Sequence, residues 1–349
     1  DCDDDAAWFT PEDGDSDGIS TCEGDCDDAD AALNLDDIDE DGYTTCAGDC
    51  DDGDASLNLD DADSDGFSTC DDDCDDEAPG RNPGEEELCW DLIDNNCDGQ
   101  TDCAYIEKID EIPDYLQVDL AYGGFPGAGT QYCGPVAVSN PLMWLDDHGY
   151  DDIIENSADR KRDQHDLIEI LGSADYMETS TDNGTSPYRL LNGLDAYLTD
   201  VGLDGYSLLY QGWRNVLPQY HTGVETPDLM WIKQGMHGNT AVILNVGWYV
   251  YDSDSDTYTR DGGHWVAMVG YNYDGSVYSP DFIVLHDSSP LAGVSFANEY
   301  VRLEPIASGT VENGSAHSAV GLYKVTDGMH KRLTIDCGIL EGVVLLRMP

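Results

Sequence analysis

The chain has 349 residues, of which 74 are acidic and 14 basic, so its formal net charge at pH 7 is −60. Nucleic acids and anionic membrane surfaces are polyanions, so this charge excludes both as favoured partners and makes divalent cations the natural counterions. No apolar run approaches the ~20 residues that a membrane-spanning helix needs.

Acidic residues and cysteines are concentrated at the N-terminal end. Residues 1–103 contain 39 of the acids, one base (Arg81) and ten of the 12 cysteines. Such a density of cysteine in a segment with almost no apolar core is typical of disulfide-bonded extracellular proteins, so we expect a secreted or cell-surface location. No secretory leader is present, and residue 1 is not expected to be the translation start.

The N-terminal segment is periodic. Residues 13–36, 37–60 and 61–84 align without gaps, and residues 1–12 fit the second half of the same unit. Repeats of this length usually form a stacked array. We therefore expect Asp/Cys calcium-binding repeats of 24 residues over 1–84, a terminal Asp-x-Asn-x-Asp-Gly motif over 85–103, and a globular domain over 104–349.

Each full repeat opens with Asp-x-Asp-x-Asp-Gly and continues with Asp-Cys-Asp-Asp. Alternate oxygens on a tight loop converge on one hard cation, and a ligand set made only of oxygens suits calcium. The position of the bidentate acid of an EF-hand holds Gly24, Gly48 or Asp72, so these are not EF-hands. A solvated acidic linker is the alternative reading. We expect several calcium ions that stabilise the fold rather than take part in catalysis. The predicted ligands are Asp13, Asp15, Asp17, Asp25, Asp27 and Asp28; Asp37, Asp39, Asp41, Asp49, Asp51 and Asp52; Asp61, Asp63, Asp65, Asp73, Asp75 and Asp76; and, in the terminal motif, Asp94, Asn96, Asp98 and Asp102.

The cysteines form a Cys-x-x-x-Cys pair in each full repeat. A zinc site formed by these cysteines is the alternative, but the first hundred residues contain no histidine. Short disulfides within a repeat are expected, with bonds between repeats as the alternative. The tract resembles the Asp/Cys metal-binding repeats of secreted bacterial surface proteins and, more distantly, thrombospondin type 3 repeats. That resemblance supports calcium.

The two ends of the array carry complementary half repeats. Cys2 lacks the partner that would lie four residues upstream, and Glu107 stands where a partner of Cys103 would be. One hypothesis is that Cys2 of one copy bonds to Cys103 of the next, which would give a head-to-tail filament. Proteolytic trimming before Asp1 and a Cys103–Cys337 bond within the chain are the alternatives.

The remainder of the chain has the pattern of a mixed domain. Helices are predicted at 133–147, 164–172 and 187–201, and strands at 240–252, 264–273, 281–287, 319–325 and 342–348. Helices followed by antiparallel strands indicate an α+β fold. The acidic stretch 251–261 could hold a cation through Asp252, Asp254 and Asp256. It has no glycine at the turn position, so a solvated hairpin tip is favoured.

Cys133, His264 and Asp287 form a candidate catalytic group. Cys133 lies at the start of a predicted helix, where the thiol pKa falls and the thiolate is favoured. His264 begins a strand after two glycines, and Asp287 ends a following strand, as a base and its orienting group require. The alternative is a buried packing cysteine and a structural histidine. His286 is the second candidate base, although its side chain should face away from that of Asp287.

The Cys-Gly-Pro of 133–135 and the Gly-His-Trp-Val of 263–266 resemble the papain-like peptidase family that removes double-glycine leader peptides, including those of bacteriocins. The resemblance covers about residues 113–325. It implies a papain-like α+β domain with N-terminal helices and a C-terminal antiparallel sheet, with Cys133 as nucleophile, His264 as general base and acid, and Asp287 as orienting group. The family's oxyanion-hole glutamine lies six residues before the cysteine, where this chain has Gly127; Gln131 is the candidate substitute.

Together these patterns predict an extracellular calcium-binding surface protein with a thiol peptidase domain that acts on a peptide substrate or a cell-surface component. The alternative is a structural or adhesive calcium-dependent filament subunit. In that case the peptidase-like domain would be inactive or used only for maturation.

Overall fold

The computed structural model describes residues 11–88, 91, 93–101, 103–155, 157–291, 298–312 and 316–349. The contacts of the chain divide it into two compact units, Asp1–Cys103 and Ala104–Pro349. Among the described residues, no helix is both long and apolar enough to cross a membrane.

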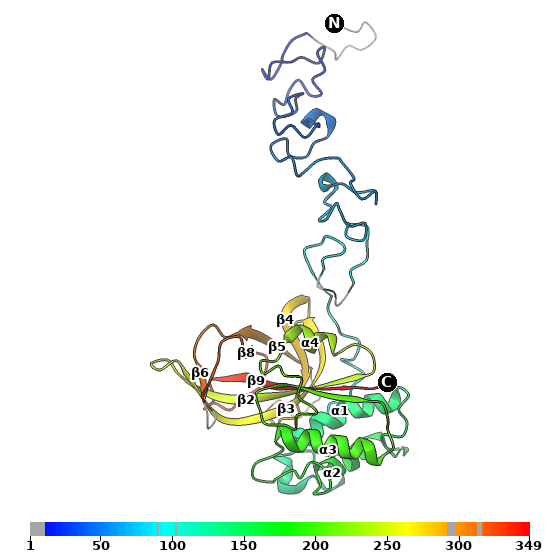
Figure 1. Ribbon diagram of the computed structural model, residues 1–349, viewed down its shortest axis with the longest axis vertical. Helices are drawn as coiled ribbons and strands as arrows, with labels where there is room; N and C mark the ends of the chain where they lie inside the picture. The colour runs from blue at the N-terminus through cyan, green and yellow to red at the C-terminus, as the bar shows by residue number, and fades with distance from the viewer. Residues whose placement is uncertain are drawn as a thin grey trace. The chain divides into compact units, whose positions relative to one another are not determined.

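The first unit consists mainly of irregular loops (Figure 1). Its 3-10 helices, η1 (Thr45–Ala47) and η2 (Thr69–Asp71), occupy the same position in successive repeats. Backbone hydrogen bonds join neighbouring repeats at the same places: the N–H of Cys46 donates to Asn34 O, and the N–H of Cys70 donates to Asn58 O. The repeats therefore share one local conformation and contact their neighbours in sequence.

Disulfides join successive repeats, so the expected bonds within a repeat are wrong. The bonds are Cys26–Cys46, Cys50–Cys70 and Cys74–Cys97. Between the two cysteines of the second repeat, η1 ends at Gly48 with a φ of 99°. This turn separates the two side chains, which bond to opposite neighbours. Bonded sulfurs are not thiolates, so the zinc alternative loses its ligands.

The two other cysteine hypotheses also fail. Cys103 is disulfide-bonded in the single chain, so it has no thiol left for a link to a second copy. Cys337 is a buried free cysteine, which excludes a Cys103–Cys337 bond. Cys2 lies outside the described residues.

The second unit combines a group of helices with one large sheet. In chain order its elements are η3 (Ala121–Gly123), η4 (Pro126–Gly129), α1 (Cys133–Asp147), α2 (Arg160–Gly172), α3 (Pro187–Asp200), β1 (Ser207–Gly212), α4 (Leu229–Gln234), β2 (Thr240–Asp252), β3 (Thr257–Tyr273), β4 (Tyr278–His286), β5 (Asn298–Pro305), β6 (Thr310–Glu312), β7 (Ala316–Ser318), β8 (Tyr323–Asp327) and β9 (Cys337–Arg347). Figure 1 shows α1, α2 and α3 grouped together, apart from α4.

The strand pairings form a closed circuit. β2 pairs with both β3 and β9, and the ladder continues from β3 through β4, β5 and β8 back to β9. Outside this circuit, β1 pairs antiparallel with β9, and β7 pairs antiparallel with β6. The sheet is mixed rather than wholly antiparallel as expected, because β6 runs parallel to the start of β3. The N–H of Thr310 donates to Asp256 O and aligns this short strand.

Two apolar cores lie on opposite faces of the central strands. Along β2, Val242, Leu244 and Val246 belong to one core, while Ala241 and Ile243 belong to the other. This two-residue period is that of a strand buried on both faces. The second core also contains the apolar side chains of α1, which packs against β3 and β2.

The predicted elements agree with the structure where the local pattern is strong. The bounds of α1 and β2 are those expected, and α3 differs by one residue. The start of α2, the N-terminal halves of β3 and β9 and the elements β1, α4, β5, β6 and β7 were not predicted. The acidic stretch at 251–261 is a hairpin tip, because β2 ends at Asp252 and β3 begins at Thr257.

Lys108 is a buried lysine that stabilises the turn between α4 and β2, and burial lowers its pKa to about 7. Its side chain is only 2% exposed. The Nζ atom donates to Met236 O at 2.7 Å, Gly238 O at 2.8 Å and Thr240 O at 3.1 Å. It also lies 4.3 Å from the centre of the Trp144 ring. Three carbonyl groups of one turn thus depend on a single donor.

We expect Lys108→Met to lower the free energy of unfolding by about 2–4 kcal/mol, because buried carbonyl groups would lose their donor. Urea denaturation measures this. Lys161→Met removes an ion pair from a side chain that is 45% exposed and should cost less than about 1 kcal/mol. Equal losses for the two variants would contradict the structural role of Lys108.

Candidate functional site

The three leading aspartates of each repeat shape an acidic loop. In the first repeat, Asp13 Oδ1 accepts the N–H of Ser16 at 2.7 Å, and Asp15 Oδ1 accepts that of Asp17 at 3.1 Å. Equivalent bonds to Asp39 and Asp63 recur at 3.1 Å. The glycine that ends each motif has a φ between 102° and 106°. That conformation strongly favours glycine, so sequence spacing and loop geometry agree.

Each loop also collects carboxylate oxygens that have no hydrogen-bond partner. The carboxylates of Asp13, Asp15 and Asp17 place one oxygen each within 4.8 Å of the others. A fourth carboxylate from the Asp-Cys-Asp-Asp motif is itself buried in each repeat. The buried oxygens without a partner among the described residues are Oδ2 of Asp15, Asp17, Asp25, Asp39, Asp41, Asp49, Asp63 and Asp73. Such a set fits a bound cation, since buried polar atoms otherwise find partners.

Repulsion between the carboxylates of a loop raises the pKa of individual aspartates. Burial raises the pKa of Asp15 against the effect of the Asp17 backbone N–H, and the charges of Asp17, Asp25 and Asp13 raise it further. Burial and neighbouring carboxylates also raise the pKa of Asp39 and Asp63. In each repeat the first aspartate of the Asp-Cys-Asp-Asp motif contributes to this repulsion. Four carboxylates therefore face one another in every full repeat.

The other predicted ligands of the full repeats brace the loops. Asp28 Oδ1 accepts the N–H of Gly14 at 2.9 Å, and the matching oxygen of Asp52 accepts that of Ile38 at 3.1 Å. Asp76 does the same for Ala62. The preceding aspartates bind locally: Asp27 and Asp51 accept the N–H groups of nearby residues, and Asp75 pairs with Arg81. Metal ligation by these six residues, like that by the other predicted ligands, stays a prediction.

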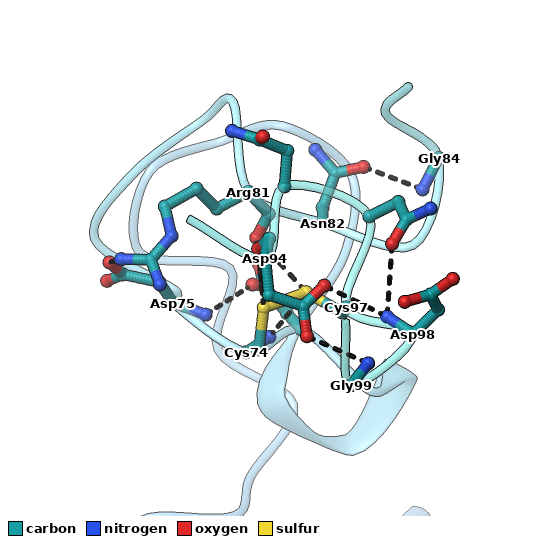
Figure 2. The surroundings of a disulfide bond; sticks show 12 residues. Cys74, Asp75, Arg81, Asn82, Gly84, Asp94, Cys97, Asp98 and Gly99 are labelled. Carbon is teal, nitrogen blue, oxygen red and sulfur yellow. Dashed lines mark hydrogen bonds and ion pairs between the residues drawn. A yellow bond between two sulfur atoms is a disulfide. The ribbon is translucent and has the colours of Figure 1, made fainter. Parts of the chain in front are cut away.

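The terminal motif forms a similar loop beside the Cys74–Cys97 disulfide (Figure 2). Asp94 accepts the N–H groups of Asp98 at 3.1 Å and Gly99 at 2.8 Å. Asn96 Oδ1 also accepts the N–H of Asp98, at 3.2 Å. Cys97 has a φ of 56°, in the left-handed region like the fourth residue of each acidic loop. Asp102 lies outside the described residues.

Glu87 is a candidate ligand that the sequence did not reveal. Its Oε2 accepts the N–H of Asn95 at 3.0 Å. Burial raises the pKa of Glu87, and the charges of Asp94 and Asp91 act in the same direction. Glu87 precedes the terminal loop in the sequence. Only the chain's return brings it near Asp94.

The structure brings Cys133, His264 and Asp287 together. Cys133 begins α1, His264 lies on β3, and Asp287 directly follows β4. His264 Nε2 lies 2.5 Å from Asp287 Oδ1, which also accepts the N–H of Ser289 at 2.8 Å. Cys133 lines the same cavity as His264, and its side chain contributes to the raised pKa of His264. The three side chains are buried, with exposed fractions of 8%, 7% and 2%.

The imidazole of His264 is held in its protonated form. Burial by itself lowers the pKa of His264, but the charge and hydrogen bond of Asp287, with a smaller contribution from Cys133, raise the pKa to about 10. A cation beside a thiol stabilises the thiolate, and so does the N-terminus of a helix. Cys133 has both neighbours.

Neighbouring side chains fix the geometry of this group. The ring of Trp248 lies nearly parallel to that of His264, with an interplanar angle of 19° and centroids 6.2 Å apart. Trp265 Nε1 donates to Thr185 O at 2.8 Å. A Cβ at Gly134 would lie 2.9 Å from the Thr185 side chain. Glycine at this position therefore lets α1 approach the segment that Trp265 holds.

Two glutamines line the same cavity of about 640 Å³ as Cys133 and His264. One is the predicted Gln131. The other, Gln117, was not predicted: its Nε2 donates to Gly129 O and Thr130 O, both at 3.0 Å. The backbone N–H of Gln117 also donates to Ser288 O. It thus joins the turn before Cys133 to the segment after Asp287, a link that no sequence spacing indicates.

His286, the second candidate base, has other partners. Its Nδ1 lies 3.2 Å from Pro113 O, and its Nε2 lies 2.9 Å from Asn298 Oδ1. Burial lowers the pKa of His286, which favours a neutral ring. Its position supports a structural role.

A family model for copper-binding MopE, described as a "Putative metal-binding motif", matches residues 73–102. The matched residues include Asp73, the Cys74–Cys97 disulfide and most of the terminal loop. No match to the chain was found among curated proteins. The matched motif, the acidic loops and the disulfides together indicate a metal-binding protein of extracellular type.

We expect the double variant Asp39→Asn, Asp41→Asn to remove one tightly bound cation per chain, because it takes two charges from a single loop. Equilibrium dialysis with calcium measures the stoichiometry. Asp54→Asn is the matched control, since the Asp54 carboxylate accepts bonds from Ser56 outside the loops. Unchanged stoichiometry in the double variant would show that this loop is not a cation site.

Proposed function

We propose that the chain is an extracellular calcium-binding protein whose second unit is a papain-like thiol peptidase. The acidic repeats would form the calcium-binding part over 1–84, with the terminal motif over 85–103. The peptidase domain would span 104–349.

The donor set supports calcium over copper. Residues 1–103 contain neither histidine nor methionine, and each full repeat has its cysteines in disulfides. Copper favours nitrogen and sulfur donors, whereas calcium takes six to eight oxygens in a flexible arrangement. The acidic loops offer carboxylate oxygens that lack other partners. A divalent cation would also relieve the repulsion that raises the pKa of Asp15, Asp39 and Asp63.

One observation carries the peptidase proposal: a buried His264–Asp287 pair beside Cys133, with His264 and Cys133 lining one cavity. Asp287 binds Nε2 of the imidazole and leaves Nδ1 for the thiol. Nucleophile, base and orienting group thus lie in the order that acyl transfer needs. A helix that carries the cysteine and packs on a strand that carries the histidine also agrees with a papain-like fold.

The chemistry follows from this order. In the resting site His264 already holds the proton as imidazolium, and the Cys133 thiolate attacks the substrate carbonyl to form a C–S bond. The imidazolium then gives its proton to the leaving amine as the C–N bond breaks. Water, deprotonated by His264, attacks the thioester, releases the acid and restores the pair of thiolate and imidazolium. The backbone N–H of Cys133 at the start of α1 and the Gln131 amide are the candidate donors to the oxyanion.

We expect a peptidyl thiol-directed electrophile to label Cys133 and to spare Cys337, whose pKa is raised by burial. Because the raised pKa of His264 retains the imidazolium through neutral pH, labelling should stay fast well below pH ~8.5, the pKa of an ordinary thiol. Mass spectrometry locates the label.

In His264→Ala the labelling rate should fall by about 10²–10⁴, as for the loss of a general base. Gln131→Ala should lower peptide hydrolysis by about 10²–10³ without preventing labelling. Labelling of Cys133 at the same rate in His264→Ala would show that the thiol is not activated.

Calcium should raise the unfolding temperature of the chain, because it binds the folded acidic loops and not the extended ones. Differential scanning calorimetry with calcium, copper and a chelator measures this. A shift with copper but none with calcium would overturn the calcium assignment and support the metal in the family's name.

A further inference from the structure

Basic side chains are concentrated in the cavity beside Cys133. Among the residues that the structure describes, four lysines and arginines line it, but only two acidic residues do, Asp182 and Asp261. Both of those acids are exposed. The four bases are Arg214, Arg260, Lys331 and Arg332. The chain as a whole has a net charge of −60, but this cavity presents several cationic side chains to an anionic ligand.

Two of these cations already have partners. Glu341 is fully buried, and Arg260 binds both of its oxygens, through Nε at 2.6 Å and Nη2 at 2.9 Å. Tyr249 also donates to Glu341, at 2.7 Å. Lys331 donates to the carbonyl groups of Ile335 and Asp336. These contacts stabilise the wall of the cavity.

Arg214 and Arg332 are available to a ligand. Nη1 of Arg214 lies 3.8 Å from Glu341 Oε1, beyond hydrogen-bond distance, and no described residue accepts its bond. Glu341 therefore offers one negative charge to two guanidinium groups. The Arg332 side chain is exposed and forms no ion pair within the described parts of the chain. A net positive charge is left at the cavity.

Two facing glycines make room, next to His264, for the charge cluster of Arg214, Arg260 and Glu341. Gly247 of β2 faces Gly263 of β3 in the ladder, and Gly263 directly precedes His264. A Cβ at Gly247 would lie 2.6 Å from the Glu341 carboxylate, and a Cβ at Gly263 would lie 2.4 Å from Arg260 Nη2. Larger residues at either position would displace the cluster.

We propose that the cavity selects peptides that carry a carboxylate close to the scissile bond, an aspartyl or glutamyl side chain, through Arg214 and Arg332. A guanidinium matches a carboxylate with two parallel hydrogen bonds, which gives direction as well as attraction. Cleavage of such peptides rests on the proposed peptidase function, whereas their binding does not.

Binding is tested in the Cys133→Ala chain, where no turnover can occur. The probes are N-acetylated, C-amidated alanine hexapeptides with a single glutamate at each position in turn, each matched by its glutamine analogue. In at least one position the glutamate peptide should bind about tenfold or more tightly than its analogue, as expected for a complementary charge. Isothermal titration calorimetry measures both.

The preference should fall to about one in the Cys133→Ala chain with Arg214→Gln and Arg332→Gln. Arg332→Gln alone, at an exposed side chain, should already reduce it and covers the case in which Arg214→Gln misfolds. Arg302→Gln is the matched control, since Arg302 pairs with Asp281 and Glu304 on the surface and should leave the preference unchanged. Equal binding of glutamate and glutamine peptides, or a preference that survives both arginine substitutions, would overturn the proposal.

Cleavage by the unmodified chain separates the two proposals. If it cleaves glutamine peptides as fast as their glutamate analogues, the selectivity is wrong and the peptidase function stands. If it cleaves none of the peptides but the Cys133→Ala chain retains the glutamate preference, the peptidase function fails and the anionic site stands.

Discussion

Repulsion between carboxylates is the constraint on which the structure of this chain depends. With 74 acids and 14 bases, few carboxylates can find a basic partner, and a tract of such charge density does not fold by itself. In the first unit the carboxylates meet in repeated loops, each with oxygens that lack a hydrogen-bond partner. Disulfides between successive repeats reduce the entropy of the unfolded chain by an amount worth about 3 kcal/mol each. Cation binding and cross-linking thus replace an apolar core.

In the second unit, three basic side chains pair with buried carboxylates. Arg160 binds the buried Asp146 at 3.0 Å, and Arg260 holds the buried Glu341 with two hydrogen bonds. His264 pairs with the buried Asp287. Removing one member of such a pair leaves an uncompensated buried charge. The His264–Asp287 pair differs from the other two because its histidine lines a cavity together with the Cys133 thiol, which makes the pair a candidate for catalysis.

Local patterns predicted a large part of the fold and of the site. The bounds of α1 and β2 follow from continuous apolar runs, and the acidic loops follow from a spacing that recurs every 24 residues. Cys133 and His264 stood out because a helix start and a pair of glycines mark them in the sequence. The disulfide pattern was not predictable, since cysteines separated by three residues allow several pairings. Only the turn between them, at Gly24, Gly48 or Asp72, decides which way each side chain points.

The sequence by itself determined where the carboxylates, cysteines and candidate catalytic residues lie along the chain, because these depend on spacing within a few residues. Tertiary structure decided what meets across long separations: the closure of β2 on both β3 and β9, the link that Gln117 makes between the turn before Cys133 and the segment after Asp287, and the charge cluster around Glu341. Such contacts depend on strand pairing over the whole domain. That pairing is selected by the total burial of two apolar cores, which no local segment contains.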